Sequence, residues 1–277
     1  MDEREQIIER IAAATKRMRA RALAMALQAG PNGAHLGSAL SIMEITATLY
    51  CGVMKIDPKN PRWEDRDRFI LSKGHGALSL YTAMAEAGLI GSEDLDTFEI
   101  NGGDFPGQPA MNMDKGIEFS SGSLGHGLSL GVGVALAGKR RGKDFRTFVL
   151  MGDGECNEGT VWEAAMAASH FALGQLVAIV DSNKLQSDGP NSAILDMKDL
   201  VSKWRSFGWD AVEVDGHDPT RLYDVFMAQR VAADMPFVVI ANTVKGKGVS
   251  FMENNNEWHH NRLSKEQHDV AVAELEK

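Results

Sequence analysis

Short apolar runs alternate with longer helix-like stretches along most of this chain. The runs cover residues 69–71, 148–151, 176–180, 211–214 and 237–241. Four of these runs are continuous, and the run 211–214 is interrupted by Glu213. Continuous apolar runs of this length are typical of strands that are buried on both faces of a parallel sheet. Their alternation with helices therefore predicts an α/β fold in three layers, α/β/α, with a mainly parallel sheet.

The helix-like stretches are amphipathic. Residues 3–28 carry a broad apolar stripe and are followed by a Gly-Pro stop signal, which predicts one long helix. A second helix is expected to begin at Ser38 or at Ser41, because Ser41 and Glu44 have the spacing of a capping box. Further helices are expected near residues 124–137 and 220–231.

The organisation along the chain predicts one domain, residues 1–277, without an obvious linker or repeat. It would include an N-terminal helical extension at about residues 1–30 and a polar amphipathic tail at about residues 264–277. Residues 91–121 are loop-rich, and a loop of that length inside a compact domain usually has a functional reason.

Composition narrows the classes of function. The net charge of −9 argues against nucleic-acid binding, which needs clustered Lys and Arg. No apolar stretch approaches the roughly 18 residues that cross a bilayer, and the N-terminus lacks the apolar core of a signal peptide. Only Cys51 and Cys156 are present, which fits a reducing cytosol. We therefore expect a cytoplasmic protein with no nucleic-acid or membrane partner.

The strongest chemical signal is a Gly-Asp-Gly turn, residues 152–154, followed after a helix and a strand by Asn183. Asp153 and Asn183 would then lie at the carboxyl ends of two parallel strands, where open α/β sheets bind ligands. Their oxygen atoms suit a hard cation such as Mg²⁺, which also keeps substrate phosphates and water as ligands. Gly152 and Gly154 let backbone N–H groups approach an anion. Together these residues predict a magnesium–diphosphate clamp.

This pattern resembles the signature of thiamine-diphosphate enzymes, and three further segments resemble transketolase in particular. The four segments are residues 33–37 (GAHLG), 67–75 (DRFILSKGH), 121–127 (SGSLGHG) and the GDG…N segment. Each motif alone is weak evidence, but all four in this order are specific. The chain is similar to the N-terminal, diphosphate-binding domain of transketolase, and more narrowly to the small subunit of split, two-chain transketolases.

The resemblance implies a set of ligands for thiamine diphosphate and its metal, with Ca²⁺ or Mn²⁺ as substitutes for Mg²⁺. Metal ligands would be Asp153, the Asn183 side chain and the Leu185 carbonyl oxygen. The cofactor-binding set comprises His75, Gly122, Ser123, Leu124, Gly152, Asp153, Gly154, Glu155, Asn183 and Lys245. For Lys245 a solvated basic loop is an equally good interpretation.

The resemblance also implies catalytic roles. His35 and His259 would face the substrate and His75 the cofactor, because an imidazole exchanges protons near neutral pH. Glu158 would support a glutamate of the partner chain, although it is also an ordinary first-turn helix residue. Gln108 stands where the family has His, so it can hydrogen-bond but cannot exchange a proton.

A second departure from the family is His260, which stands where Gly is usual. Gln108 and His260 together put the ordinary pentose-phosphate donor in question, and we expect a modified or less common ketose, such as a branched or sulfonated sugar. His126 and His217 are more typical of glycine-turn packing and of turn chemistry than of catalysis.

In this family a second, pyrimidine-binding domain supplies the glutamate that activates the cofactor and the arginines that grip the sugar phosphate, and 277 residues are expected to leave no room for it. We therefore expect a transketolase-type transferase that moves a two-carbon ketol unit from a ketose to an aldose. It would be active only in a hetero-oligomer, α2β2, with a C-terminal subunit. The alternatives are another thiamine enzyme (one chain of a 2-oxo acid dehydrogenase or of a deoxyxylulose-phosphate synthase) and a non-catalytic scaffold.

Overall fold

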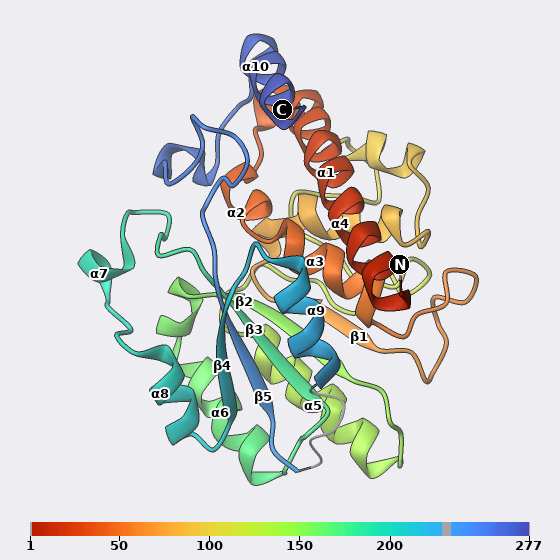
Figure 1. The fold of residues 1–277 in the computed structure, drawn as a ribbon, viewed down its shortest axis with the longest axis vertical. Coiled ribbons are helices and arrows are strands. Elements are labelled where there is room, and N and C mark those ends of the chain that lie inside the picture. The colour runs from red at the N-terminus through yellow and green to blue at the C-terminus, as the bar shows by residue number, and fades with distance from the viewer. Residues whose placement is uncertain (1, 229–233, 277) are drawn as a thin grey trace.

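The computed structural model describes residues 2–228 and 234–276. Its centre is a sheet of five parallel strands in the order β1-β2-β3-β5-β4 (Figure 1). The strands are β1 (Arg68–Leu71), β2 (Thr147–Gly152), β3 (Leu176–Ser182), β4 (Asp210–Asp215) and β5 (Phe237–Asn242). Each of the five predicted apolar runs is therefore a strand, and the mainly parallel sheet is confirmed.

Successive residues of each strand face opposite sides of the sheet and pack into two separate hydrophobic clusters. In β2, Phe148 and Leu150 belong to one cluster, whereas Val149 and Met151 belong to the other. Helices complete each cluster, so the predicted three-layer arrangement is confirmed.

The layer of helices on the Phe148 side comprises α1 (Glu3–Ala29), α2 (Leu36–Leu40), α3 (Met43–Thr48), α4 (Ala77–Glu86) and α9 (Pro219–Ala228). The opposite layer comprises α5 (Gly127–Arg140), α6 (Gly159–His170) and α8 (Leu200–Ser206). The short α7 (Asn191–Ile194) lies in the loop after β3, and α10 (Lys265–Leu275) packs against α1 (Figure 1).

Most predicted helices are present, with shifted ends. The helix expected from residue 124 begins at Gly127, because Gly125 adopts φ +84° in the turn before it. The helix expected to reach residue 231 is described as far as Ala228, and its predicted end lies outside the described residues. In the described part of the chain, no helix is both long and apolar enough to cross a membrane.

The expected capping box at Ser41 and Glu44 is wrong. The Ser41 hydroxyl donates to Asp181 (2.8 Å) and to the Ser38 carbonyl oxygen (3.0 Å), and Ile42 is the N-cap of α3. The Glu44 carboxylate turns to Arg19 and His217 instead of the backbone. Both side chains are therefore used in tertiary contacts.

Strand register brings the site residues to one edge of the sheet. Gly152 at the end of β2 pairs with Asp181 of β3, and Asp181 in turn pairs with Ala241 of β5. The backbone N–H of Asp153 also donates to the Asp181 carbonyl oxygen at 3.1 Å. The segments after β2, β3 and β5 therefore leave the sheet side by side.

Candidate cofactor site

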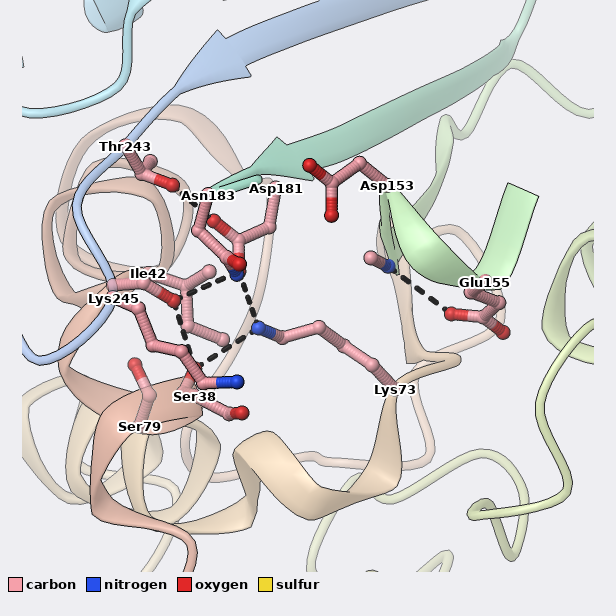
Figure 2. Close-up of polar contacts among 12 residues, drawn as sticks. Ser38, Ile42, Lys73, Ser79, Asp153, Glu155, Asp181, Asn183, Thr243 and Lys245 are labelled. Atoms are coloured by element: carbon pink, nitrogen blue, oxygen red, sulfur yellow. Dashed lines mark hydrogen bonds and ion pairs between the residues drawn. The ribbon is translucent and has the colours of Figure 1, made fainter. Parts of the chain in front are cut away.

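Asp153 and Asn183 lie at neighbouring strand ends, as predicted (Figure 2). Asp153 accepts hydrogen bonds from the backbone N–H groups of Gly154 (2.9 Å) and Lys184 (2.7 Å). Asn183 accepts one from the backbone N–H of Leu185 at 3.0 Å. These contacts fold the two loops around the strand tips and hold both oxygen-bearing side chains at the same edge.

The environment of Asp153 disfavours the charge of its carboxylate. The side chain is buried, with 3% of the residue exposed, and burial followed by the negative charge of Asp181 raises the pKa of Asp153. Across residues 2–228 and 234–276 there is no cluster of three or more His, Cys, Asp or Glu side chains suited to a metal ion. The candidate ligands are instead one carboxylate (Asp153), one side-chain amide (Asn183) and one backbone carbonyl group (Leu185). This set suits a divalent cation whose remaining ligands come from a diphosphate and water.

Asp181 is the central acceptor of a buried polar network behind the strand tips. It is 0% exposed and accepts hydrogen bonds from Lys73, Ser41, Thr243 and the Asn183 amide, the last at 2.7 Å (Figure 2). Burial acts to raise its pKa, but the charge and hydrogen bond of Lys73 prevail and lower it. The network fixes the orientation of the Asn183 side chain, because its NH₂ group donates to Asp181 and its oxygen atom points the other way.

Two lysines are buried at the same edge. Lys73 is 1% exposed and donates to the Ser38 carbonyl oxygen at 2.9 Å besides pairing with Asp181. Lys245 is 0% exposed, so the solvated-loop interpretation of this residue is wrong. Burial, followed by the charge of Lys73, lowers the pKa of Lys245 to about 8.

Four histidines gather on the other side of the lysines. The ring of His35 lies 5.5 Å from His75, 5.5 Å from His259 and 4.4 Å from His260, measured between centroids. Burial, followed by the charge of His260, lowers the pKa of His35 to about 3. Burial also lowers the pKa of His259 to about 4 and that of His75 well below its ordinary value. The three inner rings are therefore neutral at physiological pH.

A cavity of about 340 Å³ joins the strand tips to the histidines. All the predicted catalytic residues line this cavity, and so do the three predicted metal ligands, Asp153, Asn183 and Leu185. The lining also includes most of the other predicted cofactor-binding residues: His75, Gly122, Leu124, Gly152, Gly154 and Glu155. Lys245 reaches this wall through His259, since its Nζ lies 2.8 Å from His259 Nδ1. Ser123 is exposed in the turn beside the cavity.

The absence of a side chain at Gly122 leaves space for Gln108 at the histidine end of the cavity. Its φ of +123° favours glycine, and a Cβ atom there would overlap the Gln108 side chain. Leu124, in the same segment, is 38% exposed. An apolar side chain exposed at a cavity mouth is suited to contact a ligand ring or a partner.

The two glutamates of this region differ. Glu155 is 3% exposed, and its carboxylate accepts hydrogen bonds from Ser72 and from the backbone N–H groups of Gly125 (2.8 Å) and Gly152 (3.1 Å). Both of its oxygens thus brace the turns around the cavity. Glu158 is exposed at the N-terminus of α6 and makes no side-chain cap there.

A further network, not anticipated from the sequence, lies behind Lys245. His217 accepts a hydrogen bond from the backbone N–H of Val244 at Nε2 (2.8 Å), so its Nδ1 carries the proton and donates to Glu44 (3.0 Å). Glu44 also pairs with Arg19 at 2.6 Å. This chain of contacts ties the segment that carries Lys245 to α1 and α3.

Lys73 and Asp181 are important residues that the sequence did not single out, and His217 was expected only as a turn residue, which it also is. A usable signal existed for the first two: each is an ionisable residue at the end of a buried apolar run. Because parallel strands end at one edge, such residues can be expected to pair. His217 offered no comparable signal, since its partners are distant in sequence.

Comparison with known proteins connects this geometry to a family. Residues 12–275 match the family model described as "Transketolase, thiamine diphosphate binding domain". The chain belongs to the transketolase family. The family expected from the sequence is thereby confirmed, and so is the thiamine-diphosphate-binding fold.

Relatives of similar length are named as subunits. The chain is 40% identical over 241 residues to an apulose-4-phosphate transketolase subunit of Phocaeicola vulgatus, covering 87% of this chain and 85% of that protein. It is 43% identical over 243 residues to the 6-deoxy-6-sulfo-D-fructose transketolase subunit SqwG of Clostridium sp. strain MSTE9, covering 88% of each.

Solved structures of transketolases share the fold but are longer. The transketolase of Leishmania mexicana superposes with a TM-score of 0.88 at 29% identity, over 96% of this chain and 41% of that one. The transketolase of Campylobacter jejuni gives 0.85 at 26% identity, over 100% and 43%. This transketolase-family chain therefore spans about two fifths of those solved chains.

Proposed function

We propose that this chain is the diphosphate-binding subunit of a two-chain transketolase that moves a two-carbon ketol unit from a ketose to an aldose. One observation carries the proposal: the buried Asp153–Asn183 edge shares one cavity with a group of neutral histidines. The first suits a metal diphosphate, and the second suits proton transfer at a sugar hydroxyl group.

The proposed metal site rests on the oxygen atoms that are available at the strand ends. Asp153, the Asn183 amide oxygen and the Leu185 carbonyl oxygen would hold Mg²⁺, with the diphosphate and water as its remaining ligands. The Gly154 N–H, which donates to Asp153 in the structure, would turn to the diphosphate once the metal engages that carboxylate, and Lys245 would supply positive charge nearby. Bound there, thiamine diphosphate would supply the electron sink for breaking the bond between C2 and C3 of the ketose.

The histidines would handle the protons. Neutral His35 and His75 are able to accept a proton from the sugar hydroxyl group. His259 differs, because Lys245 Nζ lies at 2.8 Å from its Nδ1. With Nδ1 accepting that hydrogen bond, the neutral ring carries its proton on Nε2 and donates to a substrate oxygen. Gln108 would orient a substrate oxygen through its amide.

The partner would complete the site. We propose an α2β2 assembly with a C-terminal transketolase subunit, in which Glu158 on the rim meets a glutamate of the partner chain. Cys51 and Cys156 are free thiols, which is consistent with the cytoplasm, our proposed location.

The donor is proposed to be a modified ketose. Two relatives are named for apulose 4-phosphate and for a 6-deoxy-6-sulfo-fructose, and Gln108 and His260 alter the wall that faces the donor. The test is a donor panel assayed with the assembled enzyme, including both of these sugars, xylulose 5-phosphate and fructose 6-phosphate. Fastest turnover of xylulose 5-phosphate would reject the modified donor, and no turnover of any ketose would reject the ketol transferase.

A further inference from the structure

Lys245 carries a buried amino group whose hydrogen-bond partners are all neutral. Its Nζ lies 2.8 Å from His259 Nδ1, 3.2 Å from the Gln186 carbonyl oxygen and 3.5 Å from the side-chain oxygen of Asn256. Across residues 2–228 and 234–276, no carboxylate lies within ion-pair distance of this amino group. Burying a cation without a counterion is unfavourable, so this side chain would move to water unless its backbone were held in place.

The segment that carries Lys245 is held by three backbone contacts after it leaves the sheet at the end of β5. The Gly246 N–H and the Lys245 carbonyl oxygen are hydrogen-bonded to other backbone groups. The N–H of Val244, the residue before Lys245, instead donates to the ring nitrogen Nε2 of His217 at 2.8 Å. Of these three contacts, the one to His217 is made by a side chain, so a substitution can remove it without altering the backbone.

The contact with Val244 requires one tautomer of His217. Nε2 accepts a hydrogen bond only while the ring proton is on Nδ1, and the Nδ1–H group then needs an acceptor of its own. Glu44 is that acceptor, with an oxygen 3.0 Å from Nδ1. Burial acts to raise the pKa of Glu44, but the hydrogen bond with His217 and the charge of Arg19 prevail and lower it. The acceptor is therefore kept ionised.

Arg19 closes this network. Its Nη2 donates to Glu44 at 2.6 Å, and its Nε donates to the carbonyl oxygen of Lys247 at 3.2 Å. Arg19 belongs to α1 and Glu44 to α3, and both side chains are largely buried. Segment 244–247 is therefore held at both ends, through side chains that two helices fix in place.

We propose that His217 is a positioning residue for Lys245, and that Glu44 and Arg19 hold it in the tautomer that accepts the Val244 N–H. The network keeps the Lys245 amino group beside the strand ends, ready for an anionic group that replaces the missing counterion. This step rests on the proposed function, because it takes the diphosphate of the cofactor as that anion.

The experiment uses two substitutions of His217. In His217→Asn, the amide takes the place of Nδ1, so it still reaches Glu44 but not Val244. In His217→Gln, the longer side chain brings an amide oxygen to the place of Nε2, where it accepts the Val244 N–H. Calorimetry measures the affinity of the assembled two-chain enzyme for thiamine diphosphate in the presence of Mg²⁺. His217→Asn should weaken this affinity about tenfold or more, and His217→Gln should return it to near the wild-type value.

Lys245→Met shows whether His217 acts through Lys245. This change removes the amino group and should itself weaken the binding of thiamine diphosphate. In the Lys245→Met background, His217→Asn should change the affinity by less than about twofold, because the group that it positions is already absent. Additive effects of the two substitutions would overturn the proposal. So would equal affinities of His217→Asn, His217→Gln and the wild type.

Asp218→Ala is the matched control. Asp218 follows His217 in the same turn and accepts hydrogen bonds from the N–H groups of Thr220 (2.9 Å) and Arg221 (3.2 Å) at the start of α9. Its loss should lower the free energy of unfolding and leave the cofactor affinity unchanged, because these contacts hold α9 and not Val244. If Asp218→Ala weakened the affinity as much as His217→Asn does, loosening of the turn would explain both, and the proposal would be rejected.

Hydrogen exchange distinguishes failure of this proposal from failure of the proposed function, since it needs no cofactor. In the assembled enzyme without thiamine diphosphate, residues 243–247 should exchange faster in His217→Asn than in the wild type or in His217→Gln. If exchange responds in this way but the wild type neither binds thiamine diphosphate nor transfers a ketol unit, the proposed function is rejected and the positioning of Lys245 is upheld. If ketol transfer is normal and exchange does not respond, only the role of His217 is rejected.

Discussion

Asp153 lies in a place that disfavours the charge of its carboxylate. Burial and Asp181 raise its pKa, so at neutral pH the charged carboxylate destabilises the unliganded fold. Replacing Asp153 by Asn should therefore leave the free energy of unfolding unchanged or slightly increased. The same change removes the proposed anionic metal ligand, and we expect Mg²⁺-dependent affinity for thiamine diphosphate to fall at least about a hundredfold. Urea denaturation and calorimetry measure the two effects.

Asp199→Ala provides the control for that prediction. Asp199 caps α8 by accepting the Ser202 N–H at 2.9 Å, and its pKa is lowered, chiefly by the Ser202 hydroxyl. Its loss should destabilise the fold and leave cofactor affinity unchanged. If Asp153→Asn behaved in the same way, a metal role for Asp153 would be untenable.

The histidine group makes stability depend on pH in a definite direction. The folded-state pKa of His35, about 3, lies below its ordinary value of 6.5. Between these pH values the unfolded chain binds more protons than the folded chain does. The contribution of neutral His35 to the free energy of unfolding is therefore complete above pH 6.5 and is lost as the pH falls. From pH 6.5 to 5 this is at most about 2 kcal/mol, reduced by the partial exposure of the ring.

His35→Asn should flatten that pH dependence. Urea denaturation of the unliganded chain at pH 7 and pH 5 measures it, and the difference between variant and wild type isolates His35 from the carboxylates that titrate nearby. An identical pH dependence in the two proteins would show that the ring is not kept neutral by the fold.

Sequence reasoning located the residues whose position follows from strand ends. Asp153 and Asn183 are each the first residue after a strand built on a buried apolar run, and parallel strands bring such positions together. It did not identify the partners of Asp181, because Ser41 and Thr243 reach it from loops about 140 and 62 residues away. Tertiary contacts of that kind leave no periodic signal.

At the scale of elements, α5 packs against the sheet through a glycine. A Cβ atom on Gly131 would lie 2.4 Å from Cγ2 of Val149 on β2, whereas a Cβ atom on Gly133 would meet nothing within 4 Å. Gly131→Ala should therefore destabilise the chain by about 1–3 kcal/mol through overpacking. Gly133→Ala should stabilise it by roughly 0.5–1 kcal/mol, because Ala favours the helix over Gly.

The two α5 variants differ only in which face of one helix receives a methyl group. Denaturant midpoints of both proteins and of the wild type give the comparison. Equal effects of the same sign would mean that helix propensity alone decides, and that α5 does not sit closely on β2.

Helices and strands were predictable where the local pattern of apolar residues agrees with the packing of the folded chain. Four of the five strands follow from continuous apolar runs, since both faces of the sheet are covered, whereas the run in β4, at the sheet edge, is interrupted by Glu213. The expected capping box failed because Ser41 and Glu44 satisfy their hydrogen bonds across the fold, with Asp181 and His217. A spacing of three residues cannot show which partner a short polar side chain takes.

At the scale of the whole molecule, the site is only partly enclosed. Asp153 is buried and His35, His75 and His259 are partly buried, while Leu124 is 38% exposed and Glu158 is exposed on the rim. The chain also spans 41% of the Leishmania mexicana transketolase chain. The exposed rim is the surface that the proposed partner subunit would cover.

That arrangement predicts that the chain alone does not transfer ketol units. With thiamine diphosphate, Mg²⁺, a ketose and an aldose, its rate should be lower than that of the two-chain complex by at least about 10²–10⁴-fold, the usual contribution of a missing acid–base group. The measurement is product formation by the isolated chain, by the partner alone and by their mixture. Asp153→Ala in the mixture, with assembly verified by sedimentation, should abolish the gain, since the metal end of the cavity is then lost. Robust transfer by the isolated chain would mean that the neutral histidines and the Asp153 edge suffice, and the shared site would have to be abandoned.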